Sequence, residues 1–139
     1  GECHCAENIY LALQLGLQRI GHATALTHEP KVIQAFVDRG ATAELCLTSN
    51  LQTRAATSLA DFPYQALRAA GAKITINTDN RTVSNTTLTR EYWLFAQNFG
   101  VTIADLLQFN HDAVAAAFCT EAQKAVLHQR LDADYQPYL

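Results

Sequence analysis

The stretch Lys73-Ile74-Thr75-Ile76-Asn77-Thr78-Asp79-Asn80 decides the fold class. β-branched residues fill most of its first half, and such residues favour buried strands. An acidic side chain follows directly, at the point where the strand pattern ends. Functional side chains of parallel α/β proteins gather at the carboxyl ends of strands. The stretch therefore predicts a buried strand over residues 73–78 that presents Asp79 at a functional edge.

Upstream of this strand, short apolar runs alternate with helical periodicity. Residues 19–22 and 43–47 form two further strand candidates, and the second is expected to be buried on both faces. The other predicted elements are a helix over 6–15, a helix from Pro30 to Gly40, a polar loop over 48–62, and a helix that starts around Asp61 and Pro63 and stops at Gly71.

Downstream of the strand, only helical patterns remain. Two apolar stripes predict two helices, and Thr120 with Gln123 has the spacing of a capping box at the start of a last short helix. The first stripe contains Leu88, Tyr92, Phe95, Ala96 and Phe99, and the second contains Ile103, Leu106, Leu107, Val114 and Phe118.

The alternation of helices and strands is typical of a parallel α/β protein. A doubly wound nucleotide-binding sheet is disfavoured, because no G-x-G-x-x-G turn occurs in the sequence. A (β/α)8 barrel is favoured, but a complete one has eight strands and about 250 residues. We expect residues 1–139 to be a single-domain fragment, the C-terminal half of a TIM barrel, with three to four parallel strands, surrounding helices and an extra C-terminal helical segment. The end of the fourth strand is expected at Gly1-Glu2.

Charge and cysteine content exclude several classes of partner. The net charge of -3 and the pI near 5.9 argue against nucleic-acid and membrane surfaces, which require a concentrated basic patch. No apolar stretch approaches the length of a membrane span. The cysteines mostly lie in or beside apolar patterns, as free thiols do in a reducing compartment. We therefore predict a cytoplasmic protein.

Three side chains at strand ends are candidates for chemistry. Asp79 can be an oxygen ligand for a divalent metal, although an isolated aspartate there more often caps the following turn. His22 can act as a general base or orient a reacting water, or it can simply bond a backbone carbonyl. Glu2 can be a general acid if a closed pocket raises its pKa, or it can be a solvated carboxylate.

Taken together, these segments resemble the adenosine deaminases, a branch of the metal-dependent amidohydrolase barrels. The ordered series consists of Gly1-Glu2, Gly21-His22, the segment from Cys46 to Thr53, and Asn77-Thr78-Asp79-Asn80. The resemblance covers essentially the whole chain. It implies zinc-dependent hydrolysis of adenosine and deoxyadenosine to inosine, deoxyinosine and ammonia.

The resemblance also implies a role for each residue. Glu2 would protonate the purine ring nitrogen next to the attacked carbon, and His22 would position the water that zinc activates. Asp79 would ligate zinc and hydrogen-bond the attacking oxygen. Asn80 would bind the purine, at a position where many members of the family carry aspartate. Three further departures from the family pattern are Ala23 for glycine, Leu47 for proline and Phe62 for histidine.

The remaining zinc ligands of the family would lie upstream of Gly1. We therefore expect the chain to supply only part of the active site and to be inactive without an N-terminal half. A self-associating, inert half-barrel with an apolar interior and an adenine or other aminopurine deaminase remain alternatives. The segment Cys3-His4-Cys5 does not have the spacing of a zinc clip, and His28, His111 and His128 are interpreted as surface or packing residues.

Overall fold

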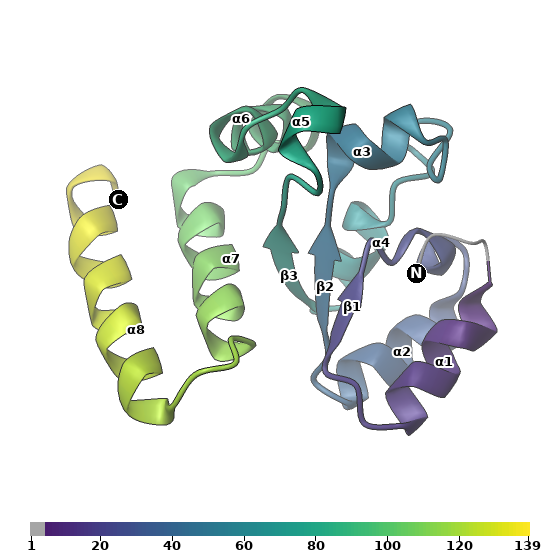
Figure 1. Ribbon diagram of the computed structural model, residues 1–139, viewed down its shortest axis with the longest axis horizontal. Coiled ribbons are helices and arrows are strands. Elements are labelled where there is room, and N and C mark those ends of the chain that lie inside the picture. Colours follow the sequence, from purple (N-terminus) through teal and green to yellow (C-terminus); the bar gives the residue numbers. More distant parts are fainter. Residues whose placement is uncertain (1–4) are drawn as a thin grey trace.

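The computed structural model describes residues 5–139, so the predicted strand end at Gly1-Glu2 lies outside the described residues. Three parallel strands form one sheet in the order β1-β2-β3 (Figure 1). The strands are β1 (Arg19–Gly21), β2 (Thr42–Leu45) and β3 (Lys73–Ile76). The prediction of parallel strands connected by helices is confirmed.

Helices connect the strands, and a second group of helices lies at one end of the sheet. α1 (Ala6–Gln14) precedes β1, and the connections between the strands contain the short η1 (Thr24–Leu26), α2 (Pro30–Asp38) and α4 (Tyr64–Ala69). The carboxyl ends of the strands point toward α3 (Leu47–Gln52), α5 (Arg81–Ser84) and α6 (Leu88–Phe99) (Figure 1). This end of the sheet is where the sequence places its candidate site residues.

The two faces of the sheet differ in character. Ile20, Ala43 and Ile74 are register partners on one face, and all three belong to the buried core. The opposite face is polar: the Arg19 guanidinium donates to Glu44 Oε1. Thr42, Lys73 and Thr75 share this polar face by register. Thr42 and Thr75 on this face are nevertheless buried and Glu44 is half-buried, so the expectation that the second strand is buried on both faces is confirmed. The expectation of an apolar barrel interior is wrong, because this face carries charged side chains.

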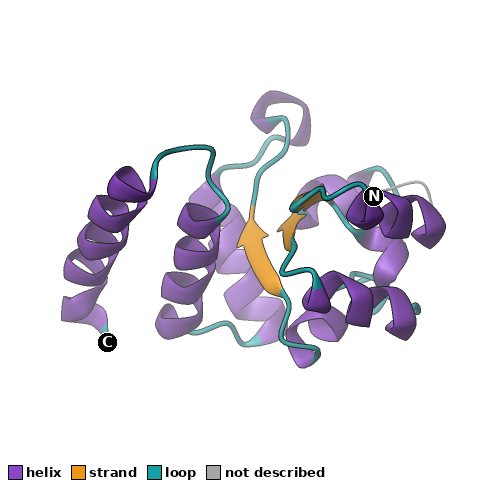
Figure 2. Ribbon diagram, turned by 90° about the horizontal axis from the view of Figure 1, so that it is seen from below, coloured by secondary structure: helices purple, strands orange, loops and turns teal. Residues whose placement is uncertain are grey.

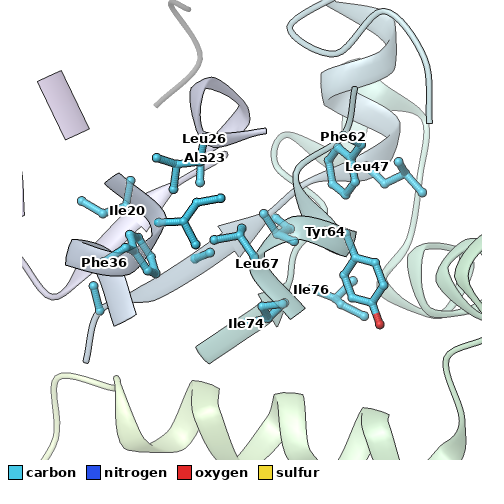
Figure 3. Packing of buried hydrophobic residues seen from close by; sticks show 14 of the residues in the cluster. Ile20, Ala23, Leu26, Phe36, Leu47, Phe62, Tyr64, Leu67, Ile74 and Ile76 are labelled. Atoms are coloured by element: carbon cyan, nitrogen blue, oxygen red, sulfur yellow. The ribbon is translucent and has the colours of Figure 1, made fainter. Parts of the chain in front are cut away.

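The core lies between the apolar face of the sheet and the connecting helices. Figure 3 shows Ile74 and Ile76 of β3 near Tyr64 and Leu67 of α4. An aromatic cluster continues this core toward α6, where the Phe95 ring meets the Tyr64 ring edge-on at 5.2 Å between centroids. Phe62 packs against Phe95 in the same way, at 5.9 Å.

Two long helices follow one another beside the sheet, next to β3. α7 (Ile103–Ala115) packs along β3, and its Asp112 carboxylate accepts a hydrogen bond from the Ile74 backbone N–H at 3.0 Å. α8 (Glu121–Tyr135) packs on α7 and lies farthest from the strands, before the terminal turn η2 (Gln136–Tyr138) (Figures 1 and 2). The capping box at Thr120 is confirmed, but the helix that follows is long rather than short.

Other boundaries differ from the sequence prediction. The polar loop expected over 48–62 contains a helix, α3, because Leu47, Ser49 and Asn50 are buried in tertiary contacts that override weak local propensity. The second strand ends at Leu45, and the helix expected to start around Asp61 begins at Tyr64. Phe118 lies beyond α7 instead of on its stripe.

Within residues 5–139, no helix combines the length and the apolar character that crossing a bilayer requires.

Substitution of Phe95 tests how much the aromatic cluster contributes to stability. The Phe95 side chain is fully buried, so Phe95→Ala removes packing contacts and is expected to lower the free energy of unfolding by about 3–5 kcal/mol. Gln97→Ala, an exposed change on the same helix, serves as the control and is expected to stay within about 0.5 kcal/mol of the parent. Urea unfolding measures both, and equal midpoints for the two variants would contradict the packing account.

Candidate active site

Backbone strain marks the turns that follow β1 and β3. His22, Ala23 and Asp79 have φ angles of 64°, 53° and 55°, in the left-handed region. This region disfavours side chains by about 1–2 kcal/mol per residue, and such strain concentrates at functional sites. Two of the three residues are sequence-predicted site residues. Glycine adopts this φ without strain, whereas the side chain of Ala23 is strained there.

Asp79 lies three residues beyond the end of β3. Its Oδ2 accepts a hydrogen bond from the Ser49 hydroxyl of α3 at 2.7 Å. The following helix is instead capped by Asn80, whose Oδ1 accepts from the Thr82 and Val83 backbone N–H groups at 3.1 and 3.0 Å. Capping is therefore the role of Asn80, and the Asp79 carboxylate is oriented by a neighbouring helix.

His22 continues the sheet by one residue, since its backbone N–H donates to Glu44 O at 2.9 Å. Its ring Nδ1 lies 3.0 Å from the Asn50 amide nitrogen. An amide nitrogen is a donor, and a neutral ring that accepts this bond at Nδ1 has its proton on Nε2. The side chain of Asn50 thus connects the His22 ring to α3.

Cys46 precedes α3 and is buried beside the site. Burial, together with the nearby carboxylates of Asp79 and Glu91, raises the pKa of its thiol to about 12. A neutral thiol is a poor nucleophile and a poor metal ligand. Cys46 is therefore a packing residue in this arrangement.

An open hollow of about 650 Å³ adjoins the end of β3. It is lined by Ile76, Asn77, Thr78, Asp79 and Arg81, together with Thr87, Leu88 and Thr89 at the start of α6. Asp79 therefore borders a space large enough for a small molecule.

Residues 5–139 contain no group of three or more histidine, cysteine or acidic side chains arranged to hold a metal ion. A zinc site needs three or four protein ligands. Among the described residues, the donor set at this edge is therefore compatible with one carboxylate ligand, Asp79, and further ligands would have to come from elsewhere.

The predicted residues are brought together by α3. Ser49 contacts Asp79 and the adjacent Asn50 contacts His22, so one helical turn touches the segments after both β1 and β3. Glu2 lies outside the described residues. His28 is exposed, whereas His111 and His128 pack together, with 2.6 Å between their Nδ1 atoms. The interpretation of these three histidines as surface or packing residues is consistent with their positions.

Sequence reasoning assigned no role to Ser49, Asn50 or Glu91. Ser49 and Asn50 were visible as polar residues after a strand, but their contacts depend on a helix that was not predicted. Glu91 is fully buried on α6. A signal for it was present, because Glu91 is three residues after Leu88 and four before Phe95, on the apolar stripe itself.

Comparison with known proteins identifies the chain. A family model described as adenosine deaminase matches residues 1–134. An adenosine deaminase from Lacticaseibacillus casei is 61% identical over 138 residues, which are 99% of this chain and 41% of the relative. The chain thus spans less than half the length of such relatives.

Solved structures also match the fold, and two of them illustrate the similarity. The adenine deaminase of Arthrobacter aurescens superposes with a TM-score of 0.89 at 23% identity, over 98% of this chain and 42% of that one. An amidohydrolase from Burkholderia ambifaria, solved with bound Zn, gives a TM-score of 0.83 at 24% identity, over 95% and 37%. The predicted fold, the C-terminal half of a TIM barrel, is confirmed.

The cap at Asn80 yields a prediction. Asn80→Ala removes the acceptor for two backbone N–H groups of α5 and is expected to lower the free energy of unfolding by about 1 kcal/mol. Asn80→Asp keeps a side-chain oxygen in place and is expected to change it by less than half as much. Urea unfolding distinguishes the two, and a loss as large for Asp as for Ala would show that the cap is not what Asn80 contributes.

Proposed function

We propose, since the chain belongs to the adenosine deaminase family, that it supplies the C-terminal part of the active site of a zinc-dependent deaminase. The enzyme would hydrolyse adenosine and deoxyadenosine to inosine, deoxyinosine and ammonia. The observation that carries the proposal is the strained Asp79 at the end of β3, with its carboxylate oriented by Ser49. The 61% identity to a relative named adenosine deaminase favours adenosine over adenine.

Zinc would be held by Asp79 together with ligands from the part of the protein upstream of Gly1. Support comes from the carboxylate at the strand end and from the bound Zn of the Burkholderia amidohydrolase. When bound, zinc supplies a water that is activated for attack at neutral pH. Ser49 donates to one oxygen of Asp79, which restricts the carboxylate to one orientation.

His22 would position the attacking water. With Nδ1 accepting from Asn50, the neutral ring offers Nε2–H as a donor. A donor there would hold the water oxygen near the amine-bearing carbon and stabilise negative charge that develops on it. The left-handed turn at His22 and Ala23 sets where this ring lies relative to the strand.

Glu2 and Asn80 would act on the purine itself. Glu2, at the end of the preceding barrel strand, would protonate the ring nitrogen next to the attacked carbon and so relieve the charge that attack builds in the ring. Asn80 uses Oδ1 to cap α5, so the group it has left for substrate is its amide nitrogen. An amide nitrogen is a donor and suits an unprotonated purine nitrogen.

The 139-residue chain would be inactive by itself, as part of a cytoplasmic enzyme whose N-terminal half completes the site. One carboxylate does not hold zinc tightly in water. The alternative, an inert half-barrel that pairs with itself through its interior, has less support. The face that such pairing would cover carries Arg19, Glu44 and Lys73, and removing these charged side chains from water would cost free energy.

Asp79→Ala in a full-length context tests the proposal. Loss of a metal ligand is expected to reduce adenosine deamination by more than about 100-fold, the upper range for partners that only support a ligand, and to lower the bound zinc per chain. Ammonia release and metal analysis by mass spectrometry give the two readouts. Asp38→Ala, an exposed change on α2, is the control.

Deamination and zinc content that both persisted in Asp79→Ala would refute the assignment of Asp79. The 139-residue chain alone forms a second arm of the experiment, in which neither zinc nor activity is expected.

A further inference from the structure

Glu91 is a buried carboxylate that the proposed mechanism does not use. It lies on α6 with none of its surface exposed. Among the described residues its hydrogen-bond donors are neutral: the Thr48 backbone N–H at 3.2 Å, the Thr48 hydroxyl, and the Thr86 hydroxyl at 2.6 Å. No arginine, lysine or histidine within residues 5–139 forms an ion pair with it.

A buried charge without a countercharge is costly unless hydrogen bonds compensate it. An apolar residue at position 91 would avoid that cost. Such a residue is compatible with this face of α6, because Phe95 on the same stripe is fully buried. The hydrogen bonds from the three donors indicate what the buried carboxylate contributes to the structure. Hydrogen bonds to a charged acceptor are short and about twice as strong as neutral ones. Glu91 therefore fixes its partners more firmly than an apolar contact would.

The partners of Glu91 belong to two segments that border the site. Thr48 is in the first turn of α3, directly before Ser49 and Asn50. Thr86 lies between α5 and α6, in the segment that continues from Asp79 and Asn80. One carboxylate thus ties α3 to the chain that follows β3.

Three consecutive side chains of α3 consequently point to three different segments. Thr48 contacts Glu91, Ser49 contacts Asp79, and Asn50 contacts His22. A displacement of Thr48 would move the hydroxyl of Ser49 and the amide of Asn50 with it, because they share one helical turn. The positions of both donors therefore depend on the bond between α6 and Thr48.

We propose that Glu91 is a positioning residue for the reaction: it fixes α3 so that Ser49 and Asn50 orient Asp79 and His22. This inference rests on the proposed deaminase function. Glu91 itself touches neither substrate nor zinc in this account, and it acts through α3.

Glu91→Gln in the full-length enzyme tests the inference, because it keeps the shape and removes the charge. Supporting partners of metal ligands typically change activity by about 10- to 100-fold, and we expect kcat for adenosine to fall within that range. KM is expected to change less than about threefold, since an interaction that matters mainly in the transition state lowers kcat. Glu7→Gln, an exposed acidic residue in the first turn of α1, is the matched control.

A double-mutant cycle with Ser49→Ala separates positioning from general destabilisation. If Glu91 acts through Ser49, then Ser49→Ala reduces kcat much less in the Glu91→Gln background than in the parent. Multiplicative effects of the two changes would overturn the inference. Thr48→Val, which removes one of the three bonds and keeps the charge, provides a milder variant if Glu91→Gln does not fold.

Hydrogen exchange separates failure of this inference from failure of the proposed function. A parent enzyme without deaminase activity would refute the proposed function. Hydrogen exchange of the α3 backbone amides would still test the role of Glu91 in that case. We expect faster exchange over residues 49–53 in Glu91→Gln than in the parent, with unchanged exchange in α1. Unchanged exchange in α3 would overturn the inference whatever the activity.

Discussion

The position of α3 against the carboxyl ends of the strands is the constraint on which the site depends. β1 and β3 are separated by β2, so their ends do not meet directly. The helix that follows β2 bridges them, with Ser49 bonded to Asp79 and Asn50 bonded to His22. A parallel sheet places the three strand ends at one edge, and α3 links the side chains that follow them. This helix therefore ties the side chains of Asp79 and His22 to one common element.

Strain and polarity are concentrated at this edge, whereas the rest of the structure follows simple packing rules. The apolar face of the sheet and the aromatic cluster around Phe95 belong to one packed core. At the functional edge, His22 and Asp79 adopt left-handed backbone conformations, and Glu91 is buried as a carboxylate. Each of these features reduces stability locally, and each lies within two contacts of the proposed site. That distribution is typical of residues retained for function.

Much of the fold could be predicted from the sequence because its signals are local. The β-branched run ending at Asp79 predicts β3, and the capping box at Thr120 predicts the start of α8. α3 could not be predicted, because Thr48, Ser49 and Asn50 have the local preferences of a turn and become helical through contacts with distant segments. The polar face of the sheet was missed for a related reason, since Arg19 and Glu44 stabilise each other across 25 positions of sequence.

The candidate site was predictable only as a set of positions. The strand ends indicate which residues meet, and the resemblance supplies their roles, but the supporting contacts of Ser49 and Asn50 depend on the tertiary position of α3. The direct test of the central claim, that Asp79 is a zinc ligand, is a crystal structure of the full-length protein with its metal. The account predicts an Asp79 carboxylate oxygen at about 2.0–2.2 Å from zinc. A zinc ion bound by other residues, with the Asp79 carboxylate turned away from it, would contradict the account.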